Sequence, residues 1–108
     1  MGNSHNNKYA EVSIESKSGV LNLGEAPLTI FEDNSKVEAR LTINVDRDSF
    51  RDYHALGQHL NSNIAFTQLH SNGVEFITRM MCQSYERRLD SKSCKVVHVF
   101  TGVKSLEV

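Results

Sequence analysis

The last third of the chain holds two long segments that are apolar at both alternating sets of positions. Strands are expected over Val74–Arg88 and Cys94–Lys104, joined by a polar turn, Leu89–Ser93. A strand with one face in water is polar at every second residue. These segments are not, so both faces of the hairpin need a cover. The sequence therefore predicts a central hairpin that is enclosed by the rest of the chain or by a partner.

The two faces of this hairpin differ in composition. One alternating set contains Val74, Phe76, Thr78, Met80, Cys82, Val97, Val99, Thr101 and Val103. The other set contains Ile77, Met81, Tyr85, Val96, His98 and Phe100. Methionine and aromatic residues are common at protein interfaces, so the second set is the predicted partner-binding face. A turn centred near Asp90–Ser91 would place Cys82 opposite Val99 and His98 opposite Gln83.

Five shorter strands are expected before the hairpin. They are Tyr9–Ser16, Val20–Leu23, Leu28–Glu32, Lys36–Val45 and Ala65–Leu69. Lys36–Val45 shows the clearest pattern, because apolar and polar residues alternate along its whole length. After this strand, apolar residues recur at every third or fourth position instead of every second one, which predicts one helix at about 49–62. Residues 1–7 are polar and are expected to be a disordered tail.

A chain of 108 residues is long enough for one core, and 39% hydrophobic residues is ordinary for a folded protein. The predicted fold class is α+β and mostly antiparallel β. We expect a β-sandwich or a partly open barrel of about seven strands, with the helix packed on it. The domain is expected to span residues 8–108.

Charge and motifs restrict the possible functions. The net charge of −1 argues against a protein that coats nucleic acid or a membrane surface, although residues 1–50 carry −3 and residues 51–108 carry +2. The sequence shows neither a secretion signal nor a membrane span, so a cytoplasmic location is expected. His54 and His59 are five residues apart, so their rings would point in different directions on a helix. A pair of histidines that binds one metal ion on a helix needs a spacing of three or four residues. No catalytic, metal or cofactor motif is present, and the two cysteines, Cys82 and Cys94, are expected to be reduced.

Three functions remain open from the residues alone. The first is a non-enzymatic interaction protein that binds itself or another protein through the second hairpin face. The second is a module for single-stranded nucleic acid that uses the basic hairpin tip, Arg87, Arg88, Lys92 and Lys95, with Tyr85 nearby. The third is a small hydrolase or ligand-binding domain in which a histidine meets Cys82 or an acid. The size also fits small phage or bacterial accessory proteins.

Overall fold

The structure is a computed structural model that describes residues 3–7, 10–17, 19–44 and 61–106. These residues form eight strands: β1 (Asn3–Asn7), β2 (Glu11–Ser16), β3 (Gly19–Glu25), β4 (Leu28–Asp33), β5 (Lys36–Asn44), β6 (Asn63–Leu69), β7 (Glu75–Asp90) and β8 (Lys95–Lys104). The expected mostly antiparallel β fold is confirmed, because every strand pair is antiparallel.

All eight strands belong to one sheet, in the order β1-β4-β5-β8-β7-β6-β2-β3. Within the described residues, β1 and β3 are therefore the two edges, and the sheet is open. This single sheet differs from a sandwich of two separate sheets and from a closed barrel. Side chains alternate between two faces along each strand, as in β5, where Val37, Ala39, Leu41 and Ile43 are buried.

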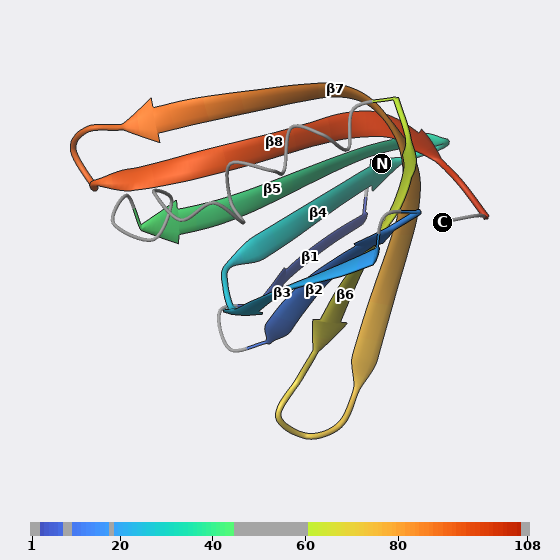
Figure 1. Cartoon of the computed structure of the whole chain (residues 1–108), viewed down its shortest axis with the longest axis horizontal. Coiled ribbons are helices and arrows are strands. Elements are labelled where there is room, and N and C mark those ends of the chain that lie inside the picture. The colour runs from blue at the N-terminus through green and yellow to red at the C-terminus, as the bar shows by residue number, and fades with distance from the viewer. Residues whose placement is uncertain (1–2, 8–9, 18, 45–60, 107–108) are drawn as a thin grey trace.

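The long strand β7 changes direction in its middle, and this bend shapes the sheet (Figure 1). Its first part pairs with β6 and its second part pairs with β8. Cys82 pairs with Gly102 whereas Ser84 pairs with Thr101, so Gln83 is an extra residue, a β-bulge. Bulges bend a strand and allow it to pass from one layer of a fold to another. The bulge therefore lets the sheet curl over its own inner face.

The inner face of the curled sheet holds the core. Its buried cluster contains Val12, Ile14, Leu23, Ala26, Leu28, Ile30, Val37, Ala39, Leu41, Ile43, Ile64, Phe66, Met80, Cys82 and Phe100. Phe66 and Phe100 come from strands that are not neighbours in the sheet, yet their ring centroids are 5.3 Å apart in an edge-to-face contact. Buried Gln68 donates from Nε2 to the carbonyl oxygen of Leu28 at 3.1 Å, which joins β6 to β4 across this interior.

The N-terminal residues and the residues just before β6 differ from the expected elements. Residues 1–7 were expected to be a disordered tail, and in the structure Asn3–Asn7 form edge strand β1 on β4. The expected helix at 49–62 falls mostly on residues 45–60, which lie outside the described residues. Asn61 and Ser62 are described, and they form a turn and bend before β6. No helix that could cross a membrane occurs in the part of the chain that the structure describes.

Candidate interaction surface

The predicted partner-binding face is divided between the two faces of the sheet. Val96, His98 and Phe100 have no exposed surface and face the interior. Tyr85 is half-buried and packs against the core cluster. These four residues are therefore covered within the protein, and the sheet does not bring them together with Ile77 and Met81 on one face.

Ile77 and Met81 lie on the opposite, outer face because of the bulge at Gln83. An extra residue reverses the alternation of side chains along a strand. Before the bulge, Met80 and Cys82 point inward, and Ile77 and Met81 point outward. Ile77 is 44% exposed, and Met81 is half-buried.

Tyr85 and His98 form a polar pair inside the hairpin. The hydroxyl oxygen of Tyr85 is 2.6 Å from Nδ1 of His98, and the two rings are stacked with centroids 5.9 Å apart. Phe100 contacts the same tyrosine ring, with centroids 5.1 Å apart. A buried imidazole needs hydrogen-bond partners, and the tyrosine supplies one. Tyr85 is thereby committed to the interior and is not presented for stacking on a nucleic-acid base.

The predicted basic tip consists of Arg87, Arg88, Lys92 and Lys95, and all four are exposed. The structure does not bring them onto one face. Arg87 is directly opposite His98 on the inner side, whereas Arg88 and Lys95 are on the outer side. Lys92 lies in the turn, where its backbone N–H donates to Oδ1 of Asp90 at 3.1 Å.

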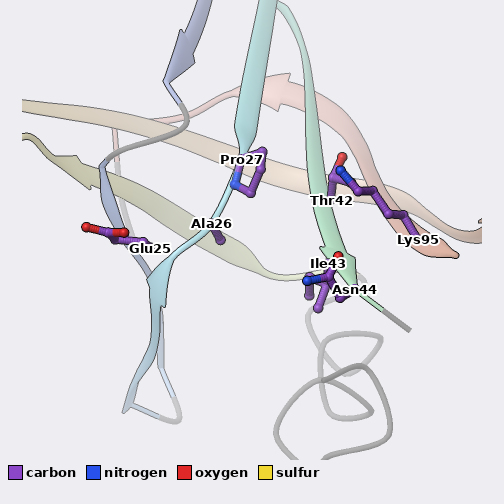
Figure 2. Close-up of a pocket in the computed structure, with 7 residues that line it drawn as sticks. All are labelled: Glu25, Ala26, Pro27, Thr42, Ile43, Asn44 and Lys95. Carbon is purple, nitrogen blue, oxygen red and sulfur yellow. The ribbon is translucent and has the colours of Figure 1, made fainter. Parts of the chain in front are cut away.

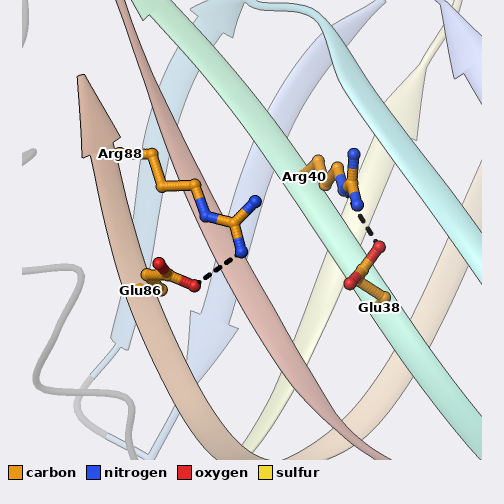
Figure 3. A network of polar contacts seen from close by, with 4 residues as sticks. All are labelled: Glu38, Arg40, Glu86 and Arg88. Carbon is orange, nitrogen blue, oxygen red and sulfur yellow. Dashed lines mark hydrogen bonds and ion pairs between the residues drawn. The ribbon is translucent and has the colours of Figure 1, made fainter. Parts of the chain in front are cut away.

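Acidic side chains partly neutralise this tip. Arg88 donates to Oε2 of Glu86 at 2.8 Å, and the pair resembles the Arg40–Glu38 pair at 2.9 Å on β5, on the other side of β8 (Figure 3). The hydrogen bond from Arg88 lowers the pKa of Glu86. The pKa of Asp90 is also lowered, mainly by the hydroxyl of Ser93, which donates to it at 2.8 Å. Both carboxylates are solvent-exposed, so these pairs contribute little to stability.

The two cysteines are in different environments. Cys82 is buried, and this burial raises the pKa of its thiol. Its thiol donates to the carbonyl oxygen of Ser84 at 3.4 Å. Cys94 is exposed in the β7–β8 turn. A buried thiol with a raised pKa is a poor nucleophile, so Cys82 lacks the activation that the hydrolase hypothesis needs.

One small pocket lies between the β3–β4 connection and the neighbouring ends of β5 and β8 (Figure 2). It encloses about 160 Å³ and is lined by Glu25, Ala26, Pro27, Thr42, Ile43, Asn44 and Lys95. No histidine or cysteine contributes to it. The described residues contain no cluster of three or more histidine, cysteine, aspartate or glutamate residues that could hold a metal ion.

A larger depression, the outer groove, lies on the outer face of β2, β3, β6 and the start of β7. It encloses about 420 Å³ and is lined by Glu11, Val12, Ser13, Asn22, Gly24, Thr67, Leu69 and Glu75. In the ladder, Leu69 is directly between Glu11 on one side and Glu75 on the other. The row beside it contains Ser13, Thr67 and Ile77. The groove therefore combines an apolar residue with two flanking carboxylates.

Exposed apolar side chains gather at the end of the β6–β7 hairpin. This hairpin end consists of Leu69, Val74, Phe76 and Ile77, which are 39–45% exposed. His70 packs edge-to-face on Phe76, with ring centroids 5.1 Å apart. By the strand register, Leu69 and Ile77 lie on the outer face, whereas Phe76 pairs with buried Gln68 and lies on the inner side. Leu69 belongs to both the hairpin end and the outer groove, so the two form a continuous surface.

This outer surface is acidic. The strand register places Glu11, Glu15, Glu25 and Glu75 on the outer face, and Arg79 is the cation on that face in the part of β7 that pairs with β6. Four carboxylates thus face one guanidinium group. Sequence reasoning did not find this surface, because its residues come from four separate strands. The excess of acidic residues in the first half of the chain was the available signal.

No protein family matches the chain, and neither the curated proteins nor the solved structures include a significantly similar one. The function is therefore argued from the geometry of the surface.

Proposed function

We propose that this chain is an interaction protein that self-associates through the hairpin end and the outer groove. The observation that carries the proposal is the exposure of Leu69 and Ile77 on the outer face of one hairpin, next to a groove of about 420 Å³. Burial of apolar surface gives about 25 cal/mol per Å², so exposed side chains of this size favour association. This outer surface is proposed as the contact surface in place of the hairpin face with Val96, His98 and Phe100, because those three residues are buried in the core.

Light scattering coupled to size exclusion tests the proposal over a range of protein concentrations. The unmodified protein should increase in mass as concentration rises, and Ile77→Lys should remain monomeric. Phe31→Lys is the matched control, because Phe31 is 42% exposed on the outer face of β4, away from the hairpin end. It should associate like the unmodified protein. A protein that is monomeric at every concentration would contradict self-association.

A second candidate function is binding of single-stranded nucleic acid at the basic tip. Four exposed cations on one hairpin favour it. The commitment of Tyr85 to His98, and the acidic partners of the tip, weigh against it. Fluorescence anisotropy with a labelled single strand at low salt tests the candidate. Binding that is lost in Arg87→Ala with Lys92→Ala would support it, and the absence of binding would exclude it.

A further inference from the structure

Asn72 and Gly73 lie in the turn between β6 and β7, at the end of the hairpin. Both residues are exposed, and so are Ser71 and Val74 on either side. Two backbone hydrogen bonds close the turn. The N–H of His70 donates to the carbonyl oxygen of Val74 at 2.9 Å, and the N–H of Gly73 donates to the carbonyl oxygen of His70 at 3.0 Å. Water and hydroxide therefore have access to the Asn72–Gly73 peptide bond.

The side chain of Asn72 folds back toward the nitrogen of Gly73. Its Oδ1 accepts a hydrogen bond from the backbone N–H of Val74 at 3.0 Å, which closes an Asx turn. The Gly73 nitrogen lies in the chain between the two bonded residues, so this turn holds the side-chain carbonyl carbon, Cγ, close to that nitrogen. Nothing lies within 4 Å of the position that a Cβ atom on Gly73 would take. The nitrogen is thus free of steric hindrance on the side of its own residue.

We propose that Asn72 is a modification site, at which the folded protein deamidates without an enzyme. Hydroxide removes the N–H proton of Gly73, and the nitrogen attacks Cγ of Asn72, so that an N–Cγ bond forms and the negative charge moves to Oδ1. The N–H of Val74 already donates to Oδ1 and stabilises this charge. The Cγ–Nδ2 bond then breaks, and Nδ2 leaves as ammonia with a proton from water. The product of this step is a cyclic imide.

Water opens the imide in a second step. The water oxygen adds to one of the two imide carbonyl carbons, the bond from that carbon to the Gly73 nitrogen breaks, and a proton passes to the nitrogen. Addition at Cγ gives aspartate in place of Asn72, and addition at the main-chain carbon gives isoaspartate. Either product adds a carboxylate to the hairpin that carries Leu69 and Ile77. This inference goes beyond the proposed function and does not depend on it.

Other asparagines of the chain provide an internal comparison. Asn72 is the one asparagine in the sequence that precedes a glycine. Asn34 also lies in a turn, between β4 and β5, but it is followed by Ser35, whose side chain hinders the approach of its nitrogen to Cγ. Asn72 should therefore react before Asn34. The hydrogen bond from Gly73 to His70 has to open before the proton leaves, so the rate should increase with the hydroxide concentration.

Peptide mass spectrometry after incubation in mildly alkaline buffer tests the proposal. The peptide that contains Asn72 should gain the mass difference between an amide and a carboxylic acid, faster as the pH rises, while circular dichroism shows that the protein stays folded. Gly73→Ala should lower this rate about tenfold or more, because a methyl group beside the nitrogen hinders its attack. Ser35→Ala is the matched control and should leave the rate at Asn72 unchanged.

Gly73→Ala also strains the turn, because Gly73 has φ 89°. Asn72→Gln is therefore the second variant. It keeps an exposed amide but places the carbonyl carbon one bond further from the nitrogen, so its peptide should gain no mass over the same period. An Asn72 amide that persists in the folded protein but is lost in guanidinium chloride would overturn the proposal, because the turn would then protect the site. Faster conversion of Asn34, or a rate that Gly73→Ala does not change, would also overturn it.

Discussion

The hydroxyl oxygen of Tyr85 lies 2.6 Å from Nδ1 of His98, and this contact joins β7 to β8 on the buried side of the sheet. Both residues belong to the predicted partner-binding face, and in the structure they pack in the interior. His98 has no exposed surface, and Phe100 packs against the same tyrosine. The pair thereby lies on the side of the C-terminal hairpin that faces the interior.

Tyr85→Phe should lower the free energy of unfolding by about 1 to 2 kcal/mol. The substitution removes the hydroxyl but keeps the ring, so the loss measures the hydrogen bond to a buried imidazole. Urea unfolding followed by circular dichroism gives the value. Ser84→Ala, at the exposed neighbouring residue, should change stability by less than about 0.5 kcal/mol. Equal effects of the two substitutions would show that the pair contributes nothing.

Gly102→Ala should destabilise the fold by about 3 kcal/mol or more. A Cβ atom at Gly102 would overlap the backbone carbonyl oxygen of Met81 on the adjacent strand, and a backbone group cannot move aside easily. Gly73→Ala is the comparison, because Gly73 has φ 89° but open space around it. It should cost about 1 to 2 kcal/mol through backbone strain alone. A smaller effect at Gly102 than at Gly73 would contradict the close approach of β7 and β8 beside the bulge.

Thiol titration should detect one reactive cysteine in the native protein and two after denaturation. Cys94 is exposed, whereas Cys82 is buried. Cys94→Ser should leave no rapidly reacting thiol in the native protein. Rapid reaction of both thiols before denaturation would show that β7 does not enclose Cys82.

Stability should also fall at alkaline pH because of Cys82. Burial raises the pKa of this thiol in the folded protein, so the folded state retains a proton that the unfolded state loses. The stability that the protonated Cys82 thiol contributes is therefore complete below the pKa of this thiol in the unfolded chain, near 9.0. It is lost as the pH rises through the raised pKa of the thiol in the folded protein. Unfolding of Cys82→Ala followed over this range should show a weaker alkaline decline than the unmodified protein. An identical decline in both proteins would assign the effect to other groups.

The positions of seven strands follow from residue patterns. The expected strand Lys36–Val45 corresponds to β5, Lys36–Asn44, because alternation of apolar and polar residues reports a half-buried strand directly. The short polar strand β1 was missed. Its sequence, Asn-Ser-His-Asn-Asn, has no apolar alternation, and pairing with β4 places it in the sheet. Such a strand depends on its neighbour rather than on its own residues.

The register of the C-terminal hairpin could not be predicted from the same patterns. The turn covers Ser91–Cys94, so Asp90 pairs with Lys95, and Cys82 lies opposite Gly102 rather than Val99. The bulge at Gln83 then reverses the two faces, although no glycine or proline lies near Gln83 on β7 itself and the nearest glycine, Gly102, is on the partner strand. For this reason the predicted face was split, while the outer groove, assembled from four strands, was not anticipated.

The location of the contact surface is tested most directly by backbone amide NMR during dilution of the unmodified protein. If the outer face is the contact surface, the signals of Leu69, Glu75 and Ile77 should shift with concentration, while those of Val96, His98 and Phe100 should stay in place. The first group borders the groove and the hairpin end, and the second group is enclosed by the core. Shifts confined to Val96–Phe100, or no shifts at any concentration, would contradict self-association through this surface.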